Sequence, residues 1–158
     1  MTTHSQASPP TAPHGRPARL LSPALTVAAV MSWVPCAVLT WARLTWSGVP
    51  ERVPTHWSGS GVVDGWGSST SAFWSLLVPG LVGALICSAL AVTLATDTTR
   101  LNAALAIGIT SAVTGAISSC WFVMVSSATG SSAALLPVLA AIVWGVLVFV
   151  VCLLRKEQ

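Results

Sequence analysis

The stretch LLSPALTVAAVMSWVPCAVLTWA, residues 20–42, carries no charged side chain over its whole length. A helix needs about 20 mainly apolar residues to cross a bilayer, so this stretch is long enough to do so alone. Outward from it, further uncharged runs of similar length follow at residues 73–95, 103–125 and 133–154. The sequence therefore predicts four transmembrane helices.

The overall composition is typical of a membrane protein. Hydrophobic residues make up 54% of the 158 positions and charged residues only 7%, whereas soluble domains carry about 25% charged residues. We therefore expect an all-α integral membrane protein surrounded by membrane lipid. Because no ionisable side chain lies in any of the four runs, proton relays, ion pathways and coupled transporters are disfavoured. The net charge of +3 forms no basic stripe, so no nucleic-acid partner is expected.

The basic residues predict the orientation in the membrane. Arg43 and Arg52 flank the runs on one side, and five basic residues lie on the other: Arg16, Arg19, Arg100, Arg155 and Lys156. Since short cytoplasmic flanks carry the excess of Lys and Arg, we expect both termini in the cytoplasm and an extracytoplasmic loop at residues 43–72. The remaining segments are then a disordered cytoplasmic tail, a cytoplasmic loop, an external turn and a cytoplasmic end, at residues 1–19, 96–102, 126–132 and 155–158.

Residues inside the runs predict some details of the helices. Pro35 lies in the interior of the first run, where its missing N–H and its ring should kink the helix. Small residues four apart, for example Ser111, Gly115 and Ser119, favour close packing in a compact bundle and leave an oligomer open. The four cysteines show no metal-ligand spacing, so we expect free thiols and no cofactor: Cys36, Cys87, Cys120 and Cys152.

The long loop contains VPERVPTHWSGSGVVDGWGS, residues 49–68, where polar and aromatic residues gather. Disorder is disfavoured, because disordered segments lack such an apolar complement: Val49, Val53, Trp57, Val62, Val63 and Trp66. Its prolines favour an extended arm at residues 49–57, and residues 58–61 supply a turn. Asp64 and Gly65 are a second turn signal. We therefore predict an ordered lid of two extended arms over the outer mouth of the bundle, with tryptophans at the membrane interface.

The order of residues in this loop resembles the signature of a known bacterial membrane domain. The residues that carry the resemblance are Pro54, His56, Trp57, Gly61, Asp64, Gly65, Trp66, Gly67 and Ser68. The domain is domain of unknown function 1648, the N-terminal domain of SdpI-type immunity proteins. Val63 stands where that family usually has a proline, and the chain is similar to a short four-span member without the C-terminal half of an SdpI-type protein. The resemblance implies a multi-pass protein of the bacterial plasma membrane.

The resemblance favours a non-enzymatic module that senses or binds a peptide, another ligand or a membrane-protein partner through the external loop. In this hypothesis no residue is catalytic, and His56 and Asp64 hydrogen-bond each other and the loop backbone. Two alternatives stay open. In the first, His56 and Asp64, with Glu51 as the one further candidate, form a metal-binding or hydrolytic site. In the second, the protein is a structural subunit of a membrane complex.

Overall fold

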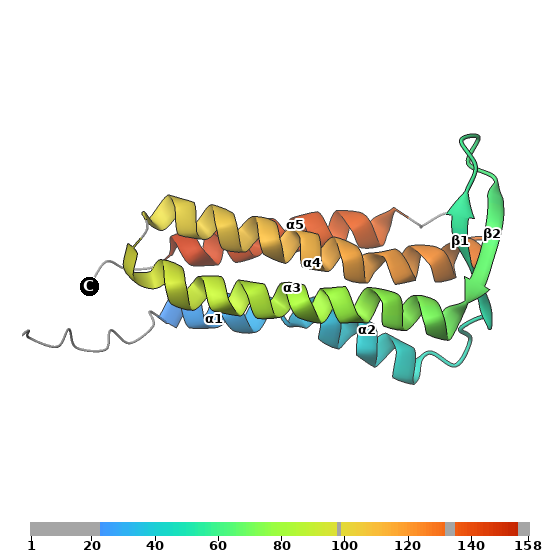
Figure 1. The fold of residues 1–158 in the computed structure, drawn as a ribbon, viewed down its shortest axis with the longest axis horizontal. Helices are drawn as coiled ribbons and strands as arrows, with labels where there is room; N and C mark the ends of the chain where they lie inside the picture. Colours follow the sequence, from blue (N-terminus) through green and yellow to red (C-terminus); the bar gives the residue numbers. More distant parts are fainter. Residues whose placement is uncertain (1–22, 98, 132–134, 155–158) are drawn as a thin grey trace, which may run out of the picture.

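The computed structural model describes residues 23–97, 99–131 and 135–154. The predicted segments at residues 1–19 and 155–158 lie outside this part of the chain. The elements follow in the order α1 (Pro23–Met31), α2 (Val34–Thr45), β1 (Arg52–Trp57), β2 (Val63–Ser68), α3 (Ser69–Asp97), α4 (Arg100–Ala128) and α5 (Leu136–Leu153). Figure 1 shows the helices side by side along one long axis, with both strands at one end of the bundle.

Within the described residues, four helical spans are long and apolar enough to cross a membrane: Pro23–Thr45, Ser69–Leu94, Arg100–Ala128 and Leu136–Leu153. The prediction of a multi-pass membrane protein is thus confirmed. The second span begins at Ser69 rather than at residue 73, because β2 ends at Ser68 and leads directly into α3. The start of α1 and the end of α5 lie at the end of the bundle away from the strands (Figure 1).

The prediction that the fold is all-α is wrong. β1 and β2 pair as an antiparallel two-stranded sheet, so the loop between the first two spans is a β-hairpin. Extended arms were expected here, but their pairing was not. The pairing follows from the turn at Gly61, which reverses the chain so that the backbone N–H and C=O groups of the two arms meet.

The first span is bent where the proline was expected to bend it. Helix α1 ends at Met31 and α2 begins at Val34, with a turn at Ser32 and Trp33 between them. Pro35 has no N–H to donate, and its ring disfavours a regular helix through the preceding turn. The Trp33 N–H donates to the Val30 carbonyl at 3.1 Å. This bond spans three residues instead of the usual four, so the turn is tighter than a turn of α-helix. The predicted kink is confirmed.

Helix α4 lies at the centre of the bundle, because 50% of its most apolar stretch is buried whereas the other spans bury 28% or less. The small residues predicted to allow close packing are buried there, among them Ser111, Gly115 and Ser119. A Cβ on Gly115 would lie 3.2 Å from the Cβ of Ala141 in α5. Such close approach supplies packing energy that burial from water cannot supply in lipid. The four cysteines are free thiols, as expected.

The core has two apolar clusters, one toward each end of the bundle. The cluster at the hairpin end includes Leu39, Phe73, Leu77, Trp121 and Val125, together with Val53 from the hairpin. The cluster at the other end includes Leu25, Ala91, Ile107 and Val148. The hairpin therefore belongs to the same packed core as the helices next to it.

Candidate functional site: the hairpin and its signature residues

Two signature-region residues of β1 dock the hairpin onto the bundle. Val53 is 0% exposed, and the side chain of Pro54 is also fully buried. Val53 packs in one cluster with Trp121 and Val125 of α4. Pro54 suits this place, because a proline lacks only a backbone donor and tolerates extended conformation. The predicted docking of the loop onto the bundle is confirmed by this burial.

The turn of the hairpin lies where the sequence placed it. The Ser58 N–H donates to the Val62 carbonyl at 2.8 Å, and the Gly61 N–H donates to the Ser58 carbonyl at 2.8 Å. Gly61 has a φ of +80°, which L side chains rarely adopt. The Ser58 hydroxyl accepts from the Val62 N–H at 3.2 Å and closes the turn. The signature glycine at position 61 is thus explained by backbone conformation.

The second predicted turn, at Asp64 and Gly65, is wrong. Both residues lie inside β2, where Gly65 pairs with His56 of β1. The register shifts between Pro54 and His56 and shifts again between His56 and Trp57. The first shift leaves an extra residue on β1 and the second leaves one on β2, so the two irregularities compensate. Asp64 is the extra residue of β2, and a bulge of this kind re-aims the side chains beside it.

Two glycines of β2 let the strands approach closely. A Cβ on Gly65 would lie 2.8 Å from the Cβ of His56, and a Cβ on Gly67 would lie 2.8 Å from Cγ2 of Thr55. Real Cβ atoms essentially never come so close, so an alanine at position 65 would push the strands apart, and one at position 67 would displace at least the Thr55 side chain. Gly65 was predicted to lie in a turn, and Gly67 was named only among the residues that carry the resemblance. Their i, i+2 spacing, which puts both on one face of a strand, was the available signal.

The side chains of His56 and Asp64 lie within ion-pair distance of each other. Nδ1 of His56 contacts Oδ1 of Asp64 across the hairpin, as the sequence suggested. The side chains are 71% and 47% exposed, so water surrounds the pair. An exposed pair of this kind contributes little to stability. The contact orients the imidazole ring, most of which stays exposed.

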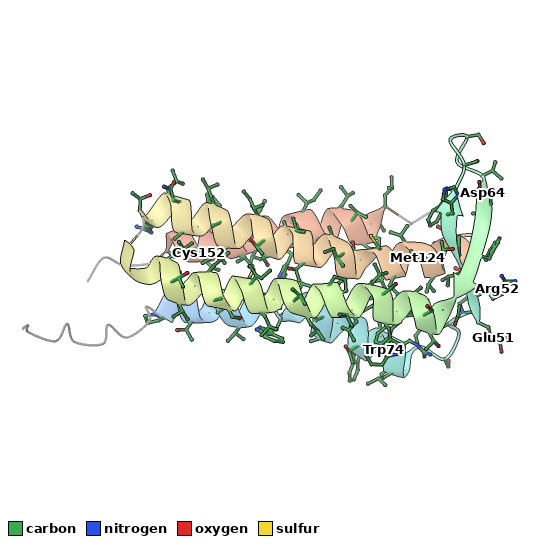
Figure 2. All side chains as sticks on the ribbon, in the orientation of Figure 1. Glu51, Arg52, Asp64, Trp74, Met124 and Cys152 are labelled. Atoms are coloured by element: carbon green, nitrogen blue, oxygen red, sulfur yellow. The ribbon has the colours of Figure 1, made fainter. Side chains whose placement is uncertain are left out.

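The described residues hold no group of three or more His, Cys, Asp or Glu side chains that could bind a metal. Glu51, the further candidate ligand, lies at the opposite end of the hairpin from Asp64 (Figure 2). Ser58, the nearest turn serine in sequence, bonds to Ser60 and Val62 rather than to His56. The arrangement therefore offers one oriented imidazole and one carboxylate, both open to water.

Of the tryptophans at the hairpin end, some are packed against the protein and others are exposed. Trp57 is half-buried, whereas Trp66 is 48% exposed. Along β2 the half-buried residues alternate with exposed ones, and Trp66 shares the exposed face with Asp64. Trp46 meets the buried Trp121 edge to face, with ring centroids 6.2 Å apart. Trp121 is fully buried and supports this end of the bundle.

The fold and the hairpin define a mostly helical, multi-pass membrane protein with a β-hairpin docked on one end of its bundle. Residues 36–82 match the family model described as Domain of unknown function (DUF1648). This part of the chain carries that domain, and it runs from α2 through the hairpin into α3. No curated protein and no solved structure gives a match. The match confirms the domain to which the loop signature was found similar.

Proposed function

We propose that the protein is a non-enzymatic recognition module of the bacterial plasma membrane, in which the hairpin binds a peptide or a membrane-protein partner. The observation that carries this proposal is that some residues of the hairpin are buried against the bundle while others are exposed. Val53 and Pro54 are buried and hold the hairpin to the bundle. Trp66 is 48% exposed, and the His56 side chain is 71% exposed. An ordered surface with an exposed aromatic ring is typical of a binding site.

The hairpin is proposed to face outward. Arg43 and Arg52 are at the hairpin end, whereas Arg100 begins α4 at the other end. Together with the basic residues of both terminal segments in the sequence, Arg100 makes that other end the more basic one. The positive-inside rule then puts the hairpin on the extracytoplasmic face and both termini in the cytoplasm.

Binding is favoured over catalysis by the surroundings of His56. Catalytic groups gain most of their effect in sites that exclude water, where fixed dipoles act in a low dielectric. His56 and Asp64 are instead open to water on the surface of a two-stranded sheet. A catalytic zinc site would need three protein ligands, and this pair supplies two. The resemblance to immunity proteins of the SdpI type supports recognition of a peptide or a membrane protein.

Site-specific photo-crosslinking in living bacteria tests the proposal. A photo-reactive amino acid at Val62, which is 63% exposed at the hairpin turn, should give a discrete protein adduct. The substitution Trp66→Ala should abolish that adduct without lowering the amount of membrane-inserted protein. The matched control is Trp74→Ala, because Trp74 is 56% exposed but lies on the flank of α3, outside the hairpin. An adduct that survives Trp66→Ala, or that only lipid forms, would contradict partner binding by the hairpin.

A further inference from the structure

A cavity opens at the foot of the hairpin, where the arm before β1, the last turn of α2 and the first turn of α3 meet. Its volume is about 560 Å³, and its lining includes Arg43, Glu51, Arg52, Ser69 and Thr70. Arg52 and Glu51 lie at this end of the molecule in Figure 2. Ligand sites of small molecules typically have volumes of about 300–1,000 Å³. None of His56, Asp64 and Trp66 lines the cavity, so a ligand site here is independent of the proposed function.

Two guanidinium groups border the cavity. Arg43 donates from Nη2 to the Thr70 hydroxyl at 3.3 Å, and Arg52 donates from Nη2 to the Trp66 carbonyl at 3.2 Å. A guanidinium has five N–H donors, so each arginine is held by one bond and keeps donors for a ligand. In the described part of the chain neither arginine pairs with Glu51. Two positive charges and one negative charge leave the lining with a net charge of +1.

Ser69 gives an independent sign of a ligand. The residue is 3% exposed, it lines the cavity, and its Oγ has no hydrogen-bond partner among the described residues. A buried hydroxyl without a partner is unfavourable, so such a group calls for an explanation. A bound oxygen atom in the cavity would satisfy it.

The backbone at the same place also favours an anion. Ser69 is the first residue of α3, and its own N–H donates to the Glu51 carbonyl at 2.9 Å. The following amides of the first turn have no acceptor within the helix, and the helix dipole puts partial positive charge there. Helix N-termini with nearby arginines are typical binding sites for phosphate groups.

We propose that this cavity binds the phosphate group of a membrane lipid, with free inorganic phosphate as the other source of the same chemistry. Arg43 and Arg52 would hold the phosphate oxygens, and the Ser69 and Thr70 hydroxyls would complete the site. The lipid source is favoured by the position of the cavity at the end of the spans. Trp41, which lies in α2 shortly before Arg43, is 70% exposed, and exposed tryptophans mark the headgroup level of a membrane.

The test measures the thermal unfolding midpoint of the full-length protein in an uncharged detergent. The probes are a short-chain phosphatidylglycerol, a diacylglycerol with the same acyl chains, and inorganic phosphate. A ligand that binds only the folded protein raises the midpoint in a saturable way. We expect the phosphatidylglycerol to do so and the diacylglycerol not to. If inorganic phosphate acts equally and with the same sensitivity to the variants below, the site is supported and the source is free phosphate.

Three variants decide whether the cavity is responsible. Arg43→Gln should weaken the apparent affinity about tenfold, since it removes a charge-assisted hydrogen bond. Ser69→Ala should also weaken it, and this small buried change keeps the test valid if Arg43→Gln does not fold. Arg100→Gln is the matched control at the opposite end of the bundle and should bind like the unaltered protein. The proposal is overturned if no phosphate compound binds, if Arg43→Gln and Ser69→Ala bind normally, or if Arg100→Gln weakens binding equally.

Discussion

The substitution Val53→Ala tests whether one side chain docks the hairpin on the bundle. Val53 is 0% exposed and packs with Trp121 and Val125. The substitution removes both methyl groups, and each buried methyl contributes about 0.8 kcal/mol. The cavity left behind adds to this loss, so the docked hairpin should be destabilised by ~2 kcal/mol. Because ~1.4 kcal/mol corresponds to a tenfold change in an equilibrium constant, the undocked population should rise ~30-fold.

Amide hydrogen exchange measures this population directly. In Val53→Ala the amides of β1 and β2 should exchange ~30-fold faster, if exchange follows the opening equilibrium. The amides of α5 should keep their rates, because α5 does not contribute to the cluster around Val53. The matched control is Val62→Ala in the same hairpin. Because Val62 is 63% exposed, this substitution should change the free energy of docking by less than about 0.5 kcal/mol. Equal exchange rates in the two variants would refute the docking role of Val53.

Two further predictions concern the hairpin. Gly65→Ala should destabilise the hairpin by about 1–3 kcal/mol, because the new Cβ would lie 2.8 Å from the Cβ of His56 and the strands must shift. Gly59→Ala is the control, because a Cβ at that position would have no atom within 4 Å. Equal thermal stability of the two variants would contradict the close approach of the strands. In a chain without native cysteines, an impermeant thiol reagent on intact cells should label Thr55→Cys, which is exposed, and spare Val53→Cys, which is 0% exposed. Labelling of both cysteines would contradict the packing of the hairpin on the bundle. Labelling of neither would contradict its outward orientation.

The membrane class and the spans could be predicted from the sequence because lipid imposes a local requirement. Each helix must satisfy its own backbone hydrogen bonds and present apolar side chains over the bilayer thickness. These are properties of single segments, and they need no knowledge of contacts. The kink at Pro35 and the turn at Gly61 were predictable for the same reason, since each depends on the conformation of one residue.

The candidate site was predicted in its residues but not in its arrangement. His56 and Asp64 were named as partners, and the structure brings them together across the hairpin. Gly65 was assigned to a turn, because an Asp-Gly pair is a turn signal when considered alone. In the structure it faces His56 instead, at a place where the register shifts twice. Local signals cannot reveal such a shift, since it depends on how the partner strand is aligned.

The sequence by itself determined that the chain is a multi-pass membrane protein, where its helices run, and which residues gather in the one long loop. Only the tertiary structure decided which residues of that loop are used to hold it in place. Val53 is buried while Trp66 is exposed because β1 lies against α4 and the exposed face of β2 points away from the bundle. That distinction arises from contacts between segments far apart in the sequence, and no property of either segment alone contains it.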